Sequence, residues 1–261
     1  LEAHIDSGLP ASVAAIRVPR SEASAFGIID AGKDRVIDRF LEKPKDPPGL
    51  PDAPDMSFAS MGNYIFSRKE FVERLNADGQ AKDSKHDMGG DIIPSFVDSH
   101  DCSVYDFTSN DVPGSTELDR NYWRDVGTID AFFDAHMDLI SVVPEFNLYN
   151  TQWPILTRQT QLPGAKFTLH GTAESSIVTN GCIISGGDVD HSVLSPGVRI
   201  ENHSVVDGCV VMNNSRVGQN CTLHNVILDK NVVVPDGVQI GVDHEADEAR
   251  GFTVSDNGIT V

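Results

Sequence analysis

The segment VVDGCVVMNNSRVGQNCTLHNVILDKNVVVPDGVQI, residues 205–240, decides the fold of the C-terminal part of the chain. Its β-branched residues come in short pairs, and Gly, Asn, Asp and Ser separate one pair from the next. This hexapeptide pattern is typical of a parallel β-helix, in which each short strand covers one face of a triangular coil. Positions six residues apart are Ile177, Ile183 and Val189; Val205, Val211, Val217 and Leu223; and, after a step of five, Leu228, Val234 and Ile240.

The repeat extends over residues 175–243, which are expected to form about four coils of about three hexapeptides each. An antiparallel sandwich is the alternative, but six residues are short for a strand and a hairpin turn together. Such a solenoid serves as a scaffold or a subunit interface, and in acyltransferases it carries a histidine-bearing cleft. Histidines at solenoid turns are mostly solvated, which disfavours an acyltransferase role for His191, His203 and His224.

Before residue 150 the pattern is different, because strand-like runs alternate with helix-like runs. Residues 68–77 and 128–141 carry apolar side chains at helical spacing, and Thr128 and Asp130 suit a helix N-terminus, where free amide groups need acceptors. This alternation predicts an α/β domain. Strands are expected at SVAAIRV (12–18), RVIDRFLE (35–42) and MGNYIFS (61–67).

A segment with two prolines and a glycine, YNTQWPILTRQTQLPGAK, separates the two patterns. It spans residues 149–166 and is expected to be a linker. The sequence therefore predicts an α/β part over residues 1–148, this linker, and a β-helix with a C-terminal tail over residues 167–261.

Composition limits the partners of this 261-residue chain. Its net charge of -19 repels polyanions, so nucleic acid and anionic membranes are disfavoured as partners. No apolar run approaches the ~20 residues that span a bilayer, and LEAHIDSGLP has neither the basic nor the apolar region of a signal peptide. These features predict a soluble, cytoplasmic protein.

The four cysteines, Cys102, Cys182, Cys209 and Cys221, form no CxxC pair, and the nine histidines are dispersed along the chain. This spacing gives no support to a zinc site and predicts reduced thiols in the core.

Three short segments contain residues suited to chemistry. In RFLEKPKDPPG (39–49), Glu42 and Lys43 follow an apolar run and precede three prolines; a surface turn with a solvated ion pair is the alternative. In SFASMGNYIFS, Ser60 and Tyr64 flank Gly62, which lets backbone approach a ligand closely. In YWRDVGTID, Asp125 precedes a helix and could hold a divalent cation, or could interact with the helix dipole instead.

Five segments carry a resemblance to a known family: EASAFGIID, FLEKP, SFASMGNYIFS, HDMGGDIIP and YWRDVGTIDAFFDAHMDLISVVPEFNLYN. In this order, and followed by hexapeptides, they resemble bacterial ADP-glucose pyrophosphorylase (glucose-1-phosphate adenylyltransferase) over nearly the whole chain. FxEKP and WxDxGT indicate only sugar-nucleotide pyrophosphorylases in general, whereas the segment through VVPEFNLYN and WPILT is more selective. HDMGG, where many relatives have HDFG, is typical of actinobacterial members.

The resemblance implies the fold and the reaction. Residues 1–148 would be the sugar-phosphate-binding, C-terminal part of a Rossmann-like nucleotidyltransferase domain, and a left-handed parallel β-helix would follow. The reaction would convert ATP and glucose 1-phosphate into ADP-glucose, the glycogen precursor, and pyrophosphate, with Mg²⁺ as cofactor. The family is typically a homotetramer regulated by a phosphorylated metabolite.

The resemblance also implies residue roles. Lys43 would bind the phosphate of glucose 1-phosphate, while Glu42 would accept hydrogen bonds from sugar hydroxyls. Asp125 would be one of two carboxylates on Mg²⁺. The remaining implied contacts are Gly27 and Ser60 against the sugar, Tyr64, Asp87 and Trp123 as the pocket wall, and Lys230, otherwise a solvated lysine, on the effector.

One part of the family pattern has no counterpart in this sequence, namely the glycine-rich GGxGTRL loop that binds the nucleotide. The chain is therefore expected to be inactive by itself. Two alternatives stay open: another sugar-nucleotide pyrophosphorylase, such as a uridylyltransferase fused to an acetyltransferase, and a non-catalytic regulatory subunit assembled through the β-helix.

Overall fold

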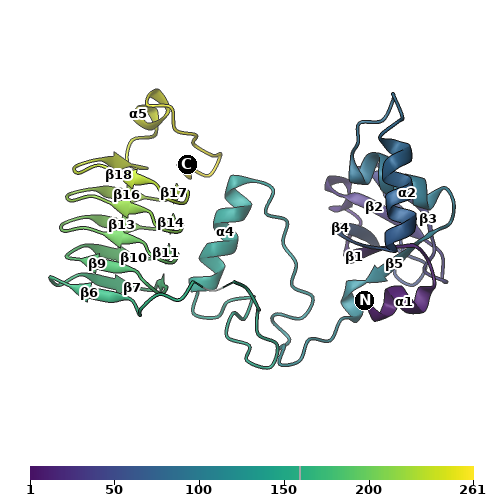
Figure 1. Ribbon diagram of the computed structural model, residues 1–261, viewed down its shortest axis with the longest axis horizontal. Helices are drawn as coiled ribbons and strands as arrows, with labels where there is room; N and C mark the ends of the chain where they lie inside the picture. Colours follow the sequence, from purple (N-terminus) through teal and green to yellow (C-terminus); the bar gives the residue numbers. More distant parts are fainter. Residues whose placement is uncertain (159) are drawn as a thin grey trace. The chain divides into compact units, whose positions relative to one another are not determined.

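The computed structural model describes residues 1–158 and 160–261 (Figure 1). The chain forms two compact units, Leu1–Val112 and Pro113–Val261, each with its own hydrophobic core. In the part of the chain that is described, no helix has the length and apolar character needed to cross a bilayer.

The first unit is built on a mixed five-stranded sheet with the order β3-β2-β4-β1-β5. Strands β1 and β5 are parallel, whereas the pairs β1–β4, β2–β4 and β2–β3 are antiparallel. The strands are β1 (Ala11–Pro19), β2 (Gly27–Ala31), β3 (Ile37–Glu42), β4 (Met56–Phe66) and β5 (Cys102–Asp106).

Short helices complete the core of this unit. The fully buried Phe96 belongs to one apolar cluster with Val13 of β1 and Ile29 of β2. The stacked rings of Phe66 and Phe71, with centroids 4.2 Å apart, join β4 to the helix that follows it. The helices are α1 (Glu2–Ser7), α2 (Arg68–Asp78) and α3 (Ile93–Val97), with 3-10 turns η1 (Ala23–Ala25) and η3 (Phe107–Ser109) and a π-helical turn η2 (Met88–Ile92).

The expected elements of this part are present with shifted ends. The strand predicted at 12–18 is β1, and the helix predicted at 68–77 is α2. The strand predicted at 35–42 begins at Ile37, because Arg35 has a φ of 64° and belongs to the preceding turn. MGNYIFS is the second half of β4, whose first half was not predicted, and β2, β5 and α3 were not predicted either.

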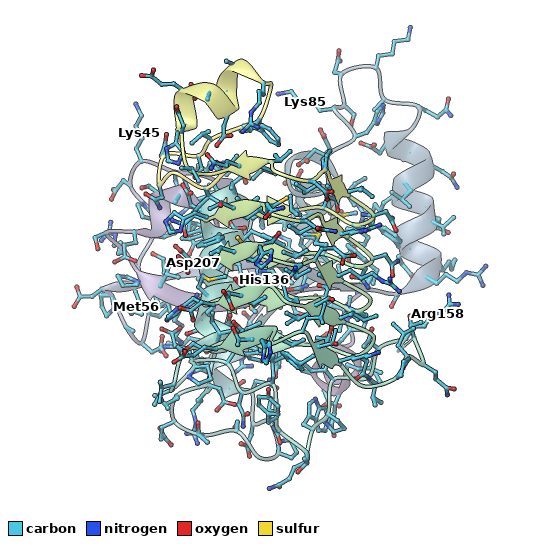
Figure 2. The ribbon with its side chains drawn as sticks, turned by 90° about the vertical axis from the view of Figure 1, so that its left-hand side faces the viewer. Lys45, Met56, Lys85, His136, Arg158 and Asp207 are labelled. Atoms are coloured by element: carbon cyan, nitrogen blue, oxygen red, sulfur yellow. The ribbon has the colours of Figure 1, made fainter. Side chains whose placement is uncertain are left out.

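The second unit contains a parallel solenoid of about four coils, which confirms the predicted fold class (Figures 1 and 2). Its three sheets have the orders β6-β9-β12-β15-β18, β7-β10-β13-β16-β19 and β8-β11-β14-β17. The strands are β6 (Lys166–Thr168), β7 (Thr172–Glu174), β8 (Ile177–Val178), β9 (Ile183–Ser185), β10 (Asp188–Asp190), β11 (Val193–Leu194), β12 (Arg199–Ile200), β13 (Val205–Asp207), β14 (Val210–Val211), β15 (Arg216–Val217), β16 (Thr222–His224), β17 (Ile227–Leu228), β18 (Val233–Val234) and β19 (Gln239–Ile240).

The register of the coils corrects the predicted spacing. Asp188 pairs with Val205 and Val205 pairs with Thr222, a difference of 17 positions in each case, so two sides of a coil have six residues and one has five. A step of five falls between Val206 and Val211, both fully buried. Val205, which belongs to the six-residue series with Val211, Val217 and Leu223, therefore faces outward and is 43% exposed. The inward positions from the second coil onward are Leu194, Ile200, Val206, Val211, Val217, Leu223, Leu228, Val234 and Ile240.

Helix α4 (Ile129–Ile140), predicted at 128–141, packs on the solenoid. Phe133 is buried in one cluster with Val210 of β14 and Ile227 of β17. Residues 113–148 therefore belong to the same compact unit as the β-helix, because sheet β8-β11-β14-β17 covers the apolar face of α4. The division at 148 and 166 remains a prediction about domains.

The last coil is followed by α5 (His244–Ala249), which was not predicted. Its Asp247 is 1% exposed and accepts a hydrogen bond from the Gly241 backbone N–H at 2.7 Å. Arg250 donates to the same carboxylate. The helix is thereby tied to the strand end at β19.

All four cysteines are buried and free, as expected from their spacing. Burial raises the thiol pKa of Cys102 in the first unit, and of Cys209 in the solenoid, to about 12.

Candidate functional site

The pairing of β2 with β3 places Glu42 over Gly27. The two residues are direct cross-strand partners at the end of both strands. A Cβ atom at Gly27 would lie 3.2 Å from Oε2 of Glu42 and 3.1 Å from the ring of Phe40. These distances are shorter than ordinary van der Waals contacts. A glycine at residue 27 therefore leaves room for the Glu42 carboxylate and the Phe40 ring above the backbone. The exposed Glu42 carboxylate is an acceptor for ligand hydroxyls.

The chain turns sharply immediately after Glu42. Lys43 has a φ of 45°, and its backbone N–H donates to the Phe26 carbonyl at 3.1 Å. Both Glu42 and Lys43 are exposed, and within residues 1–158 and 160–261 neither takes part in an ion pair. Glu42 and Lys43 therefore form no direct ion pair, and the ammonium group of Lys43 is available to an anion. An ordinary solvated surface turn stays the alternative.

The proline segment is anchored to its surroundings. The Pro47 carbonyl accepts from Arg20 Nε at 2.6 Å, and the Pro48 carbonyl accepts from the buried Ser57 hydroxyl at 2.7 Å. Pro47 is buried itself. The exit of β3 is thus held by contacts to β4 and the η1 region, which reduces the freedom that Lys43 loses on binding an anion.

A bulge in β4 sets the position of Ser60 and Tyr64. Val13 pairs with Tyr64 and Ala15 pairs with Ser60, so β4 has two more residues than β1 between these pairs. Gly62 lies in the bulge with a φ of 69°, a conformation that favours glycine. Gly62 is required for this backbone turn, and its N–H donates to the Ser60 hydroxyl at 3.3 Å.

Asp87 begins the π-helical turn η2. Its Oδ1 accepts from the Gly90 N–H at 2.6 Å, and its own N–H donates to Oδ2 of Asp91 at 3.0 Å. A Cβ atom at Gly89 would lie 3.6 Å from Oδ1 of Asp87 and 3.8 Å from the Phe40 ring. The η2 turn therefore lies against the same ring that covers Gly27.

The pKa of Tyr64 depends on burial and on three of the predicted site residues, Glu42, Ser60 and Asp87. Burial raises the pKa of the Tyr64 phenol, and the negative charges of Asp87 and Glu42 raise it further, while a hydrogen bond with Ser60 opposes them. Tyr64 stays protonated at neutral pH and can donate a hydrogen bond. The structure thus brings together Gly27, Glu42, Ser60, Tyr64 and Asp87 in the first unit.

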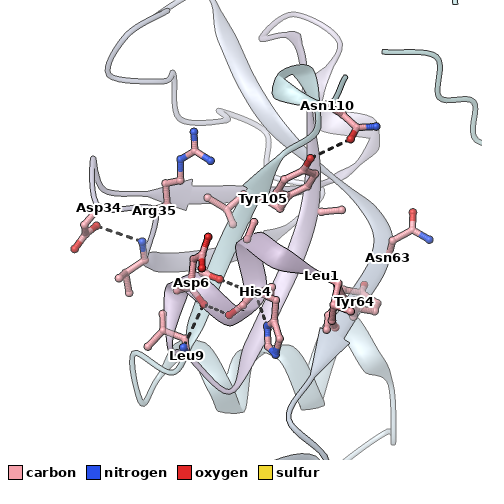
Figure 3. Close-up of a pocket in the computed structure, with 18 residues that line it drawn as sticks. Leu1, His4, Asp6, Leu9, Asp34, Arg35, Asn63, Tyr64, Tyr105 and Asn110 are labelled. Carbon is pink, nitrogen blue, oxygen red and sulfur yellow. Dashed lines mark hydrogen bonds between the residues drawn. The ribbon is translucent and has the colours of Figure 1, made fainter. Parts of the chain in front are cut away.

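A cavity of about 630 Å³ lies between α1, β1, β4 and β5 (Figure 3). Its lining includes His4, whose Nδ1 is 2.8 Å from the Ser12 hydroxyl, and Ser103, 2.7 Å from the same hydroxyl. Among the predicted site residues it shares Tyr64 with the group above, whereas Gly27, Glu42 and Asp87 do not line it.

Trp123 and Asp125 belong to the second unit. Asp125 is exposed, and its Oδ1 accepts from the Gly127 N–H at 3.0 Å. Thr128, not Asp125, is the N-cap of α4, because its hydroxyl accepts from the Ala131 N–H. A single exposed carboxylate with one oxygen outside this turn bond fits a hard divalent cation as one ligand among several. Its place beside Glu42 and Lys43 stays a prediction.

Lys230 lies at a solenoid turn, before Asn231, which has a φ of 62°. Its side chain is 68% exposed, and Nζ is 3.5 Å from Oδ1 of Asp229. Such an exposed pair holds the lysine weakly. Lys230 is accessible to a dissolved anion.

Sequence reasoning missed Phe40, Gly89 and Asp91. Phe40 could have been found, because alternation along β3 puts it on the same side as Glu42 two residues later. Gly89 and Asp91 belong to a π-helical turn, for which the sequence carries no periodic signal.

Two family models match the chain. The first, described as nucleotidyl transferase, matches residues 1–142, and the second, described as GlmU-like C-terminal hexapeptide, matches residues 163–261. The chain belongs to the nucleotidyl transferase family. Enzymes of this family generally use a divalent metal ion.

Curated relatives extend this family assignment. The chain is 63% identical over its whole length to a glucose-1-phosphate adenylyltransferase of Cutibacterium acnes, and 55% identical over 99% of its length to one of Frankia casuarinae. A third, from Corynebacterium glutamicum, is 56% identical. The chain spans 64% of the length of each of these relatives. The match to actinobacterial relatives agrees with the prediction drawn from HDMGG.

Proposed function

We propose that this nucleotidyl transferase chain supplies the sugar-phosphate side of a cytoplasmic glucose-1-phosphate adenylyltransferase. The observation that carries the proposal is the closing pair of β2 and β3, where Glu42 lies over Gly27 and an unpaired Lys43 follows. A carboxylate and a neighbouring ammonium on a rigid turn match a ligand that has hydroxyl groups at one end and a phosphate at the other. The names of the curated relatives agree with this ligand.

In this proposal each group has a separate task. The bare backbone at Gly27 forms the floor under the sugar, and Glu42 accepts hydrogen bonds from its hydroxyls. Lys43 donates to the phosphate. Ser60 and the protonated Tyr64 provide hydroxyl donors, and Asp87 and Trp123 complete the wall.

The reaction places modest demands on these side chains. A phosphate oxygen of glucose 1-phosphate attacks the α-phosphorus of ATP, the bond from this phosphorus to the bridging oxygen breaks, and pyrophosphate leaves with the electron pair. Lys43 orients the attacking phosphate and offsets its charge, so that two anions approach each other at a lower cost. Asp125 would hold Mg²⁺, which supplies charge stabilisation for phosphoryl oxygens when it is bound.

The activity can be tested with a fusion that joins this chain to the part of the Cutibacterium acnes relative that it does not match. We expect ADP-glucose from ATP and glucose 1-phosphate, with much lower turnover for UTP. The 261-residue chain alone is the control and should give no product. Preference for UTP would favour a different pyrophosphorylase, and an inactive but folded fusion would favour the non-catalytic regulatory subunit.

Regulation is a second part of the proposal. Lys230 would contact a phosphorylated effector, and the solenoid would assemble the protein into a homotetramer. In the fusion, Lys230→Ala should weaken activation by a phosphorylated metabolite and leave turnover without effector nearly unchanged. An unaltered activation curve would return Lys230 to an ordinary surface lysine.

A further inference from the structure

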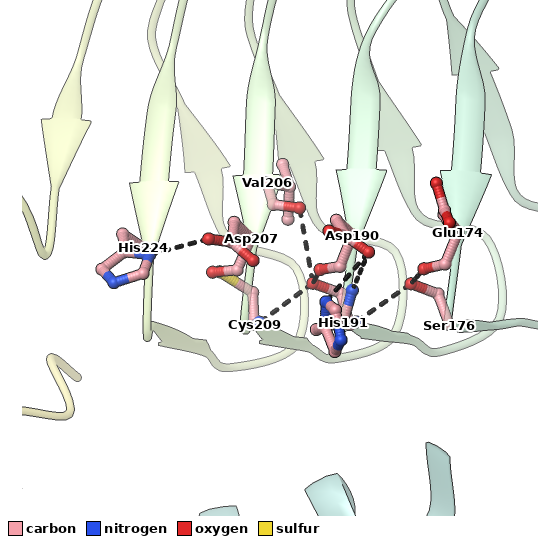
Figure 4. A network of polar contacts seen from close by, with 9 residues as sticks. Glu174, Ser176, Asp190, His191, Val206, Asp207, Cys209 and His224 are labelled. Atoms are coloured by element: carbon pink, nitrogen blue, oxygen red, sulfur yellow. Dashed lines mark hydrogen bonds and ion pairs between the residues drawn. The ribbon is translucent and has the colours of Figure 1, made fainter. Parts of the chain in front are cut away.

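One corner of the solenoid gathers side chains with no part in the proposed reaction. Asp190 ends β10, His191 follows it in the turn, and Asp207 ends β13 one coil later (Figure 4). One ligand atom from each of the three residues lies within 4.8 Å of the other two. This cluster could not be recognised in the sequence, because its two parts are separated by a full 17-residue coil.

One of the three separations is close to that required around a small metal ion, and none exceeds 4.8 Å. Nδ1 of His191 is 3.0 Å from Oδ1 of Asp190. Ligands at 2.0–2.2 Å from a tetrahedral Zn²⁺ are about 3.3–3.5 Å apart, so the Asp190–His191 separation needs only a small adjustment, and the side chain of Asp207 would move toward the pair to complete the site. All three side chains are partly solvent-exposed and can make it.

The charges at this corner are not balanced by the protein. Throughout residues 1–158 and 160–261, no Lys or Arg forms an ion pair with Asp190 or Asp207, and the ion-pair partners they have are histidines. The neighbouring cavity of about 450 Å³ is lined by His191 and Asp207 and by no Lys or Arg. Its lining also includes Ile140 and Ser141 at the C-terminal end of α4, where the helix dipole is negative. Each of these features favours a bound cation.

The backbone under the cluster is fixed. The hydroxyl of the fully buried Ser192 donates to the Asp190 carbonyl at 2.6 Å and accepts from the Cys209 N–H at 2.9 Å. His224 of the next coil has Nδ1 3.0 Å from Oδ2 of Asp207. An imidazole in this position orients a carboxylate ligand in the way that outer partners orient the ligands of known metal sites.

We propose that Asp190, His191 and Asp207 form a binding site for a divalent transition-metal ion of the zinc type. One imidazole nitrogen and two carboxylate oxygens suit Zn²⁺ or Co²⁺, whereas Mg²⁺ prefers oxygen ligands alone. The cavity leaves room for a solvent molecule as the fourth ligand. The bound ion links two successive coils beside α4.

The test uses Co²⁺ and Zn²⁺ with the metal-free 261-residue chain. Absorption of Co²⁺ reports a tetrahedral site with a nitrogen ligand, and calorimetry with Zn²⁺ gives affinity and stoichiometry. His191→Asn and Asp207→Asn should each remove one equivalent of bound metal or weaken it by more than about 10-fold. His224→Asn should weaken it by about 10- to 100-fold. Excess Mg²⁺ should not displace the ion.

His203→Asn is the matched control, because His203 is also an exposed solenoid histidine with a positive φ, of 60° against 41° for His191. Asparagine tolerates this backbone conformation, so neither variant should disturb the turn. The proposal is overturned if His191→Asn binds Zn²⁺ with the affinity and stoichiometry of the unaltered chain, if His203→Asn loses as much as His191→Asn, or if Mg²⁺ displaces Zn²⁺ readily.

Discussion

The two units of this chain bury their apolar side chains in different ways. In the solenoid, Leu194, Val211 and Leu228 occupy equivalent inward positions in successive coils. In the α/β unit, each buried contact is made once, as with Phe96 in the core or Glu42 over Gly27. A repeated environment suits assembly and stability, whereas an unrepeated one can be shaped around a single ligand. The candidate sugar-phosphate residues lie mostly in the unrepeated unit.

The largest effect is expected from removing an inward side chain of the solenoid. Leu223→Ala should reduce the free energy of unfolding of the second unit by about 2–5 kcal/mol, because a fully buried leucine leaves a cavity between two coils. Thermal and denaturant unfolding would measure this change.

Val205→Ala is the control for this prediction. A simple six-residue period places Val205 and Leu223 in the same inward row, but the structure leaves Val205 43% exposed. Its replacement should change stability by no more than about 0.5 kcal/mol. Equal losses for both variants would contradict the register of six, six and five residues.

A binding defect without a stability defect is expected in the α/β unit. Lys43→Gln removes a charge-assisted hydrogen bond worth roughly 1.5–3 kcal/mol, which corresponds to about 10- to 150-fold weaker binding of glucose 1-phosphate. Calorimetry on the 261-residue chain would measure the affinity, and the melting temperature should stay the same.

Lys45→Gln provides a matched comparison two residues away, since Lys45 is also exposed. It should bind glucose 1-phosphate as the unaltered chain does. Comparable losses for Lys43→Gln and Lys45→Gln would indicate a general charge effect and would remove Lys43 from the site.

Acid should weaken the α/β unit through Asp106. Burial acts to raise the pKa of this carboxyl group, but hydrogen bonds from Thr108 and from Arg17, at 2.8 Å, outweigh it and lower the pKa. The stabilisation is complete above the unfolded pKa and is lost as pH falls through the folded value. The free energy of unfolding should therefore decrease on acidification below about pH 4.

Asp106→Asn should cost about 1–3 kcal/mol at neutral pH and flatten this acid dependence. Asp46→Asn is the control, because the Asp46 side chain is 90% exposed in its pair with Arg20 and should contribute little. Urea unfolding at a series of pH values would separate the two. An acid dependence that survives in Asp106→Asn would assign it to other carboxylates.

The smallest expected effect is a change in the alkylation rate of one buried cysteine, which reports the opening of its own unit. With thiol pKa values of about 12, Cys102 and Cys209 should be alkylated only when their own unit opens. Leu223→Ala should speed the labelling of Cys209 and leave Cys102 unchanged, as measured by mass spectrometry of the peptides. Parallel acceleration at both cysteines would show that the two units open together.

The solenoid could be predicted from the sequence because its signal is repeated in every coil. The exact register could not, since Val205 and Val206 are both apolar and neighbouring coils decide which of them faces inward. In the α/β unit, the strand and turn around Glu42 and Lys43 were predictable from an apolar run and prolines. Strands β2 and β5 were missed, because five residues are too few to show a period.

The candidate site, like the fold, could be predicted only in part. Single residues such as Glu42, Lys43 and Tyr64 were identified through their motifs. No local pattern encodes how the strands pair. The packing of Phe40 over Gly27 and beside Gly89, and the effect of the Asp87 and Glu42 charges on the pKa of Tyr64, therefore could not be predicted. For the same reason, the cluster of Asp190, His191 and Asp207 could not be seen before the coils were stacked.

The 17-residue coil sets a unit of length for the second half of the molecule. An extra residue within a strand would put the following side chains out of step with the coil beneath, and an extra residue at a turn would have to loop out, whereas adding a whole coil would leave each residue above an equivalent neighbour. Related chains can therefore change the height of this solenoid only in steps of one coil. Helix α5, whose Asp247 binds the Gly241 N–H after the last strand, would have to follow the new last coil as a complete unit.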